Sequence, residues 1–325
     1  MAKKITDLLP GAKEQVVMRD FNTFKVGGVA DYFYEAKSVE DLIKAVKVAV
    51  NQKLSYFILG NGSNILFSDY GFPGLVIKNM AAPVAFMIEK SQVIADSGVI
   101  LTKLIMESVS HDLSGLEFLY GVPGTVGGAV YGNAGAHGSA IGSYVKSLTL
   151  LKIDPKDNLP KVVQVDGAWM NFGYRQTKLK NLKSKTKPVI LTVRFQFSRI
   201  QKEKLMRHLK EYQEYRRRTQ PVGLTTGSIF KNPIPDSLIN VIGSGTKGMP
   251  ELPPERTAGF MLDQADAKRL KYSTVEVSPK HANWVLSKNG AKATEIRSLI
   301  EEMRERVRQK YGITLEEEIE YIGQW

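Results

Sequence analysis

The segment GVPGTVGGAVYGNAGAHG, residues 121–138, holds seven of the chain's 28 glycines within eighteen residues. A glycine has no Cβ, so it accepts positive φ angles and lets another group approach the backbone closely. The segment is too small and too polar to form a core, and its backbone offers many N–H groups. It therefore predicts a chain wrapped around a large, flat or phosphorylated ligand, whose identity decides the function.

The composition indicates a globular protein of two or three domains. The chain has 325 residues, of which 43% are hydrophobic, an ordinary share for a soluble protein. No run approaches the roughly 20 apolar residues of a membrane span, and the N-terminus lacks the apolar stretch of a signal peptide. We therefore expect a cytoplasmic protein that does not engage a membrane, and we expect a monomer.

Residue usage excludes several kinds of site. The chain has no cysteine, which excludes disulfides, thiolate metal sites and cysteine nucleophiles. Its four histidines are scattered, so we expect no metal. The net charge of +12 suits either nucleic-acid binding or attraction of small anions. No nucleic-acid motif accompanies the basic runs, so nucleotides are favoured over nucleic acid.

Helical and strand patterns are interleaved, which favours an α+β or mixed α/β architecture. Ser38 is a predicted helix cap, because an acid follows it three residues later and a helical apolar repeat comes next. The apolar runs at 56–59, 65–67, 75–77 and 93–94 are predicted short strands. Residues 188–198 alternate between apolar and polar side chains, which predicts a half-buried strand.

The pattern changes after this strand. Residues 200–218 predict a polar helix, and we place a domain boundary near residue 200. Residues 244–257, rich in glycine and proline, predict a loop or an insertion. Residues 294–311 predict a long amphipathic helix that ends at Gly312. Residues 314–322 then predict a closing strand.

The motif GNGSN at residues 60–64 follows a predicted strand. It is not a Rossmann fingerprint, because the third glycine of G-x-G-x-x-G would fall on Ile65. It is either a loop that offers backbone donors to phosphate oxygens or a plain Asn-Gly turn. Together with residues 121–138 it suggests a dinucleotide in an unusual cradle, and the alternative is a series of tight turns.

Two further constellations leave their roles open. GSIFKNP, residues 227–233, sets Ser228 near a lysine and an asparagine, but spacing alone favours a cap or a turn, since a free serine is a poor acid and lacks a histidine base here. Alternation puts Glu316, Glu318 and Glu320 on one face of the last strand, either as a solvated acidic edge or facing a ligand.

In their order, these segments resemble one family, UDP-N-acetylenolpyruvoylglucosamine reductase, over essentially the whole chain. The resemblance rests on NTFKVGG (22–28), LGNGSNILFSD (59–69), GLEFLYGVPGTVGGAVYGNAGAHG (115–138), Tyr174-Arg175, GSIFKNP (227–233), SPKHAN (278–283) and LEEEIEYIG (315–323). Only 53 positions separate Arg175 from Ser228, which resembles the shorter subclass that lacks an extra tyrosine-bearing segment. Thr177 stands where the family usually has serine, and Asp96 lies in a segment expected near the flavin.

The resemblance implies an α+β fold: a two-domain FAD-binding module of the vanillyl-alcohol-oxidase type plus an α+β substrate-binding domain. Residues 1–80 would form the first FAD-binding subdomain, 81–199 the second and 200–313 the substrate-binding domain. Residues 314–325 would return near the active site. FAD would bind non-covalently, and NADPH would be the hydride donor. The implied FAD-binding residues are Gly60, Asn61, Gly62, Ser63, Asn64, Gly121, Pro123, Gly124, Thr125, Gly127, Gly128, Asn133, Ala134 and Gly135.

The resemblance also implies the catalytic roles. Arg175 would stabilise the enolate formed by hydride addition, Glu318 would polarise the substrate carboxylate and Ser228 would donate the proton. The choice of Glu318 over Glu316 rests on the register of the motif. The residues implied at the diphosphate of the sugar-nucleotide substrate are Lys231, Asn232, Gln220 and Arg218.

Two rival functions stay open at this point. Another FAD-dependent oxidoreductase of the same fold would share both glycine loops, but it has no reason to carry Arg175, GSIFKNP and Glu318 together. A non-enzymatic nucleotide- or nucleic-acid-binding protein would account for the basic charge.

Overall fold

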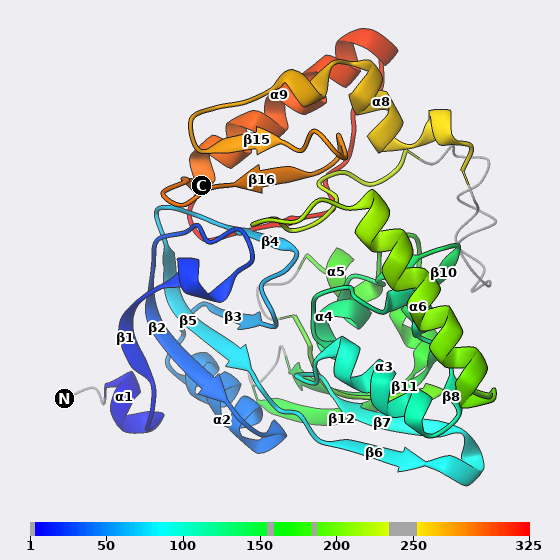
Figure 1. Cartoon of the computed structure of the whole chain (residues 1–325). Helices are drawn as coiled ribbons and strands as arrows, with labels where there is room; N and C mark the ends of the chain where they lie inside the picture. The colour runs from blue at the N-terminus through cyan, green and yellow to red at the C-terminus, as the bar shows by residue number, and fades with distance from the viewer. Residues whose placement is uncertain (1–3, 155–158, 184–186, 234–251) are drawn as a thin grey trace.

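The computed structural model describes residues 4–154, 159–183, 187–233 and 252–325. Figure 1 shows two sheet-containing parts side by side in the lower half of the molecule and a C-terminal α+β part above them. The N-terminal helix α1 (Ile5–Leu8) lies at one side, and the 3-10 turn η1 (Met18–Phe21) leads toward the second strand.

The first sheet has the strand order β1-β2-β5-β3, with β1 (Lys13–Val17) antiparallel to β2 (Val29–Ala36). Strand β5 (Phe72–Asn79) runs parallel to β2 and to β3 (Tyr56–Leu59). Helix α2 (Val39–Asn51) begins at the predicted cap, since the Ser38 side chain accepts a hydrogen bond from the Asp41 N–H.

Helix α2 packs between the two sheets. Its apolar residues form one core with β2 and β5 on one side and with Leu151, Val189 and Leu191 of the second sheet on the other. The two lower parts of the molecule are therefore joined by apolar burial, which is the dominant stabilising term in folding.

The second sheet is antiparallel throughout, in the order β12-β11-β13-β7-β6. Its strands are β12 (Pro160–Asp166), β11 (Val145–Ile153), β13 (Val189–Gln196), β7 (Gln92–Asp96) and β6 (Val84–Met87). Strand β13 confirms the predicted alternation at 188–198, because Val189, Leu191, Val193, Phe195 and Phe197 are all buried.

Helices α3 (Leu101–Ser110), α4 (Val126–Tyr131) and α6 (Lys202–Thr219) contribute buried residues to the core of the second sheet. Helix α4 lies inside the glycine segment 121–138, so the expectation that this segment takes no part in a core is wrong for Val126, Ala129 and Val130. Smaller elements complete this part: β8 (Leu113–Ser114), β9 (Gly135–Ala136), β10 (Ser139–Ala140), α5 (Lys178–Asn181), β14 (Ser198–Arg199) and the 3-10 turns η2 (Ile88–Lys90), η3 (Glu117–Leu119), η4 (Ile141–Tyr144) and η5 (Gly167–Met170).

The C-terminal part is built on the long helix α9 (Ala293–Tyr311), which ends at Gly312 with a φ of 67°, as the sequence predicts. It packs with α8 (Ala258–Gln264) and the hairpin of β15 (Val275–Val277) and β16 (Val285–Ser287). Turns η6 (Pro254–Arg256) and η7 (Ala267–Arg269) flank α8. Residues 244–251 of the predicted loop or insertion at 244–257 lie outside the described residues.

Strand β4 (Ile65–Phe67), which lies between β3 and β5 in the chain, links the first sheet to the C-terminal part of the molecule. It pairs in parallel with β17 (Glu320–Ile322), near the end of the chain. Asp69, just after β4, accepts hydrogen bonds from the Ala293 and Thr294 N–H groups at the start of α9. The C-terminal part is thereby fixed to the segment that follows the first glycine loop.

The predicted strand at 314–322 is wrong in extent, because only Glu320–Ile322 is a strand. Strand β4 has just three residues to pair with, so the ladder ends at Glu320. Residues before it turn to another partner: the Lys231 N–H donates to the Glu316 carbonyl, and the Glu318 N–H donates to the Ile229 carbonyl. The acidic segment therefore bonds to residues 229–231 in its first half and to β4 in its second half.

We propose domain limits from the packing. Helix α6 belongs to the second core, since Leu205 and Leu209 lie in it. The second FAD-binding subdomain would then extend to about the end of α6 at Thr219, rather than to residue 199.

Within the described ranges, no helix has the length and apolar character needed to cross a membrane, and no group of three acidic or histidine side chains is arranged to hold a metal.

Candidate active site

The two glycine loops lie against each other. The Ser63 hydroxyl donates a hydrogen bond of 2.7 Å to the Pro123 carbonyl. A Cβ added at Gly60 would lie 2.7 Å from the Thr125 Oγ1, closer than a real Cβ contact. The structure thus brings together the first and second predicted cofactor loops, which are about 60 residues apart in sequence.

The donors of these loops suit a phosphate-bearing cofactor. Over the described residues, several of their backbone N–H groups donate no hydrogen bond within the protein: those of Asn61, Gly62, Ser63, Asn64, Gly124 and Thr125. Clustered, unpaired backbone N–H groups bind phosphate oxygens. The residues present therefore fit the pyrophosphate of FAD.

The rest of the glycine segment is shaped by close approaches. Thr125 caps α4 by accepting a hydrogen bond from the Gly128 N–H. A Cβ on Gly127 would lie 2.8 Å from the Ser97 Cβ, at the end of β7. Asn133 has a φ of 47° and its side chain donates to the Gly173 carbonyl at 2.7 Å. The segment is thus fixed against the second sheet and against the chain that leads to Arg175.

Arg175 and Glu318 meet although 143 residues separate them. The Arg175 Nε lies 2.8 Å from the Glu318 Oε1, a contact of opposite charges without hydrogen-bond geometry. The two side chains are only 17% and 18% exposed. Arg175 has a left-handed φ of 53°, and a Cβ on Gly135 would lie 3.4 Å from its Nη1. The predicted catalytic arginine therefore lies next to the predicted flavin segment.

Glu318 is fixed through its backbone as well. Its N–H donates to the Ile229 carbonyl at 2.7 Å. Its carbonyl accepts from the Asn64 Nδ2 at 3.2 Å and from the Lys180 Nζ at 3.5 Å. Ser228, the third predicted catalytic residue, directly precedes Ile229 and is half-buried. Four segments of the chain therefore converge on Glu318.

Lys231 and Asn232 follow on the same segment. Lys231 is buried, and its ammonium pairs with the exposed Glu316 carboxylate. The Asn232 N–H donates to the Tyr174 hydroxyl at 3.0 Å, and its Oδ1 accepts from the Ala258 N–H at 3.1 Å. Burial raises the pKa of Tyr174. Asn232 thus joins the second subdomain to the start of α8.

The C-terminal end of α6 carries a residue that sequence reasoning missed. The Arg216 Nε donates to the Tyr120 carbonyl at 2.9 Å and its Nη2 to the Phe118 carbonyl at 3.2 Å. Burial lowers the pKa of Arg216, and the Arg175 cation lowers it further. The run of three arginines at 216–218 was the available signal, but it does not tell which one is turned inward.

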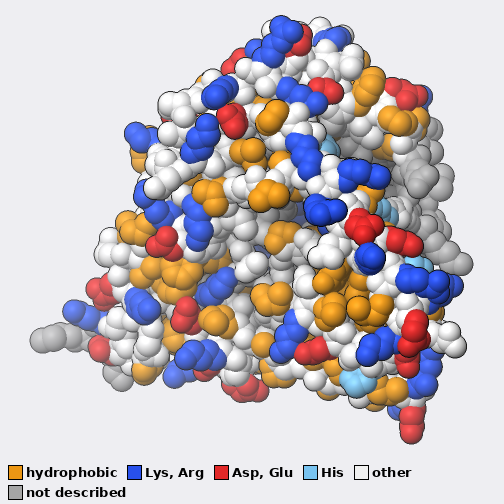
Figure 2. All heavy atoms as spheres, viewed as in Figure 1, with side chains coloured by type: hydrophobic (Ala, Val, Ile, Leu, Met, Phe, Trp, Pro, Cys, Tyr) orange, Lys and Arg blue, Asp and Glu red, His pale blue; other side chains and the backbone are white. Residues whose placement is uncertain are grey.

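Of the two predicted substrate residues in this region, Gln220 is half-buried and Arg218 is exposed. The Gln220 Oε1 accepts a long hydrogen bond of 3.5 Å from the Arg216 Nη1. Arg218 is exposed, with its guanidinium carbon 5.9 Å from the centre of the Tyr215 ring. Lys and Arg side chains gather near the middle of this face, between α6 and the C-terminal part (Figure 2).

Two departures from the family pattern have structural explanations. Thr177 is fully buried, caps α5 by accepting from the Lys180 N–H, and donates to the Tyr131 carbonyl at 2.8 Å. Asp96 faces α2: burial and the nearby Glu40 carboxylate raise its pKa to about 6. Neither side chain contacts Arg175, Ser228 or Glu318 in the described structure.

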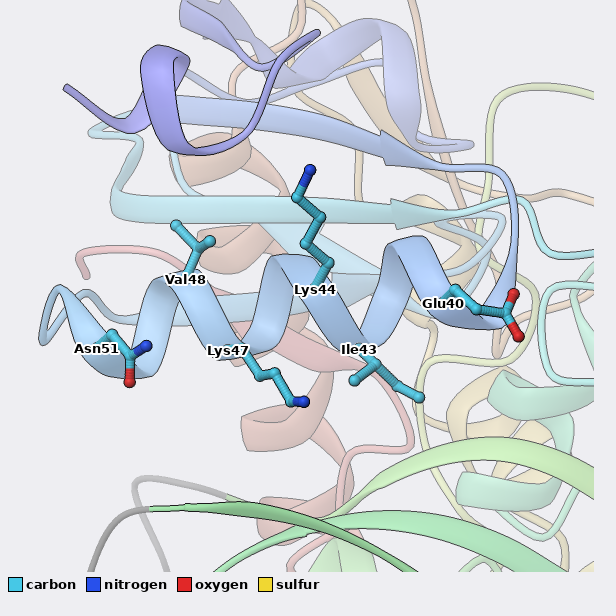
Figure 3. Close-up of a pocket in the computed structure, with 6 residues that line it drawn as sticks. All are labelled: Glu40, Ile43, Lys44, Lys47, Val48 and Asn51. Atoms are coloured by element: carbon cyan, nitrogen blue, oxygen red, sulfur yellow. The ribbon is translucent and has the colours of Figure 1, made fainter. Parts of the chain in front are cut away.

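A surface hollow lies elsewhere, on α2 alone. Figure 3 shows its lining, which contains none of the predicted site residues: Glu40, Ile43, Lys44, Lys47, Val48 and Asn51. All six side chains come from consecutive turns of α2, on the side away from its buried face, so the hollow has no part in the site described above.

The fold and the paired glycine loops define a flavin-binding protein. Residues 30–155 match the family model of an FAD binding domain, and residues 220–322 match that of the C-terminal domain of UDP-N-acetylenolpyruvoylglucosamine reductase. The predicted α+β fold class with an FAD-binding module is confirmed, and the two-domain form of that module, its vanillyl-alcohol-oxidase type and a separate substrate-binding domain stay predictions.

Whole-chain relatives agree. The UDP-N-acetylenolpyruvoylglucosamine reductase of Caldicellulosiruptor saccharolyticus is 33% identical over 311 residues, which cover 95% of this chain and 91% of that protein. The enzyme of Acaryochloris marina is 34% identical over 313 residues, covering 95% and 92%. The crystal structure of the Thermus caldophilus enzyme has a TM-score of 0.73 at 27% identity, covering 95% of this chain and 98% of that one. The chain belongs to the UDP-N-acetylenolpyruvoylglucosamine reductase family and is an FAD-dependent oxidoreductase.

Proposed function

We propose that this protein reduces the enolpyruvyl group of UDP-N-acetylenolpyruvoylglucosamine to form UDP-N-acetylmuramate, with electrons that NADPH delivers through FAD, in peptidoglycan precursor synthesis. The observation that carries the proposal is the Arg175–Glu318 pair, which lies beside the flavin segment and one hydrogen bond from the residue that follows Ser228. An alcohol oxidase has no need for a largely buried cation–carboxylate pair at this place.

The residues of the two loops would hold the cofactor. The free N–H groups of residues 61–64 and of Gly124 and Thr125 would bind the pyrophosphate. The residues that would face the flavin are Gly127, Gly128, Asn133, Ala134 and Gly135. When bound, FAD supplies the hydride chemistry. The proposed cofactor-binding set is the one implied by the sequence, from Gly60 to Asn64 and within Gly121 to Gly135.

The chain's own residues would manage the charge of the reaction. Hydride addition to the vinyl group leaves negative charge on the substrate carbon that carries the carboxylate, and catalysis requires groups aimed at that developing charge. Arg175 would stabilise it from its buried position, and Glu318 would orient that cation while polarising the substrate carboxylate. Ser228 would then give its hydroxyl proton to the same carbon.

The sugar nucleotide would extend toward α6 and the 231–232 segment. Lys231, Asn232, Gln220 and Arg218 are proposed to bind its diphosphate. The Lys231 ammonium is paired with the Glu316 carboxylate, and the Asn232 Oδ1 accepts a hydrogen bond from α8. The diphosphate would therefore bind the Asn232 Nδ2 and would share the Lys231 ammonium with Glu316. We further propose a cytoplasmic monomer.

Two measurements test the proposed function. An absorbance spectrum of the purified protein should show bound flavin, and stopped-flow mixing should separate flavin reduction by NADPH from reoxidation by UDP-N-acetylenolpyruvoylglucosamine. The proposal requires fast reoxidation by this substrate in the absence of oxygen. Reoxidation by oxygen alone would indicate an oxidase, and a colourless protein that takes up no FAD would indicate a non-enzymatic binding protein.

A further inference from the structure

Three alternate glutamates of the C-terminal segment each pair with a cation from a different part of the chain. The pairs are Glu316 with Lys231, Glu318 with Arg175, and Glu320 with Lys180. The first two involve residues already proposed to act on substrate. The third pair has no role in the proposed function, although both of its side chains are largely buried, at 17% and 29% exposure.

Lys180 is held in place by its own surroundings. It lies in the short helix α5, whose cap Thr177 is bonded to the Tyr131 carbonyl in the last turn of α4. The Lys180 carbonyl accepts a hydrogen bond of 2.9 Å from the Lys187 Nζ. Helix α5 is therefore fixed to the end of α4, and the Lys180 side chain extends from α5 to the C-terminal segment.

The Lys180 ammonium contacts that segment at two points. Its Nζ lies 3.4 Å from the Glu320 Oε1 and 3.5 Å from the Glu318 carbonyl oxygen. Residues 315–319 lie outside the named strands, and an antiparallel bridge between Phe230 and Glu317 joins them to the 229–231 segment. The Glu318 N–H bonds across this bridge, whereas the Glu318 carbonyl is held by the Asn64 and Lys180 side chains. Lys180 bonds one of the backbone groups of Glu318 and fixes the side chain two residues further on.

We propose that Lys180, through its pair with Glu320, is a positioning residue for Glu318. The inference rests on the proposed function, because Glu318 must have a catalytic role for its placement to matter. Lys180 does not itself touch the reacting atoms. Loss of its contacts would let the 318 backbone move, and a shift of about 1 Å in a catalytic group costs roughly 100-fold in rate.

The test compares Lys180→Met and Lys180→Arg with Lys178→Met, a matched control in the same helix. Lys178 is exposed and its ammonium lies over the Trp169 ring, 4.6 Å from the ring centre. For Lys180→Met we expect reoxidation at saturating UDP-N-acetylenolpyruvoylglucosamine to slow by about 10- to 100-fold. Flavin reduction by NADPH, FAD content and the calorimetric Kd for the substrate should stay within about twofold of wild type. Lys180→Arg should recover most of the rate, and Lys178→Met should match wild type.

A double-mutant cycle gives an independent measurement. Glu320→Gln should slow reoxidation by no more than Lys180→Met, which also removes the contact with the Glu318 carbonyl. The double variant should be no slower than Lys180→Met, because both single variants remove the Lys180–Glu320 ion pair. Additive effects would overturn the inference. So would a weaker substrate Kd with an unchanged saturating rate, which would make Lys180 a direct ligand. If the wild-type enzyme is not reoxidised by this substrate, the proposed function fails instead.

Discussion

The paired glycine loops make a sharp prediction for Gly60→Ala. The new methyl would lie 2.7 Å from the Thr125 Oγ1 and 3.6 Å from its Cγ2, whereas ordinary contacts begin near 3.4 Å. Thr125 cannot easily retreat, because it is buried and its hydroxyl caps α4. The two loops must therefore separate. Overpacking of this kind costs about 1–3 kcal/mol, which is roughly a 5- to 150-fold increase in the Kd for FAD if the cost falls on binding.

The assay is titration of deflavinated protein with FAD, followed by flavin fluorescence. Gly132→Ala is the matched control within the second segment, because its Cβ would meet nothing nearer than the Gly128 carbonyl at 3.6 Å and its φ is −86°. We expect this control to bind FAD like wild type. Equal FAD affinity in the two variants would show that close contact between the loops does not set the cofactor site.

Three further predictions follow from the site. Ser228→Ala should leave flavin reduction by NADPH intact and slow substrate-dependent reoxidation by about 100- to 10,000-fold; equal loss in both steps would exclude a proton-donor role. Glu318→Gln should cost far more turnover than Glu316→Gln, whose side chain is 68% exposed, and steady-state kinetics showing the reverse order would reverse that assignment. The pKa of Asp96 is raised in the fold to about 6, so its stabilising effect is complete below about pH 4 and lost as pH rises through 6. Asp96→Asn should therefore be more stable than wild type above pH 6, by about 1 kcal/mol after allowance for its exposure; thermal unfolding curves whose difference does not shrink toward pH 4 would contradict this.

Local signals predicted a part of the elements and missed others, such as β11, α3 and α8. Ser38 and Gly312 act through contacts within a few residues, and the alternation at 188–198 marks the face that is buried; the structure confirms each of them. The closing strand was wrong in extent because its partners are non-local: half of the predicted segment bonds to residues 229–231 and half to β4. No pattern within residues 314–322 could reveal that division.

The candidate site shows the same limit. Motif resemblance selected Arg175 and Glu318, and the structure brings them to 2.8 Å. The sequence could not show that Arg216 is the arginine turned toward the glycine loop, because three consecutive arginines on a helix look alike until the packing of α6 is known. Nor could it show Lys180, whose proposed role arises from its contacts with Glu320 and with the Glu318 carbonyl.

The pairing of β4 with β17 explains how Glu318, the proposed catalytic glutamate near the end of the chain, is aligned with the proposed cofactor loop at residues 60–64. Strand β4 starts directly after Asn64, and its register places Glu320 opposite Ile65. Asn64 makes two hydrogen bonds with the C-terminal segment. Its carbonyl accepts from the Glu320 N–H at 3.1 Å, and its side chain donates to the Glu318 carbonyl at 3.2 Å. Because a slip of one residue would reverse every side chain of the strand, this register fixes Glu320, and the Asn64 side chain then helps to place Glu318 beside the first glycine loop. The same loop would therefore bind the cofactor and align the acid that acts on the substrate.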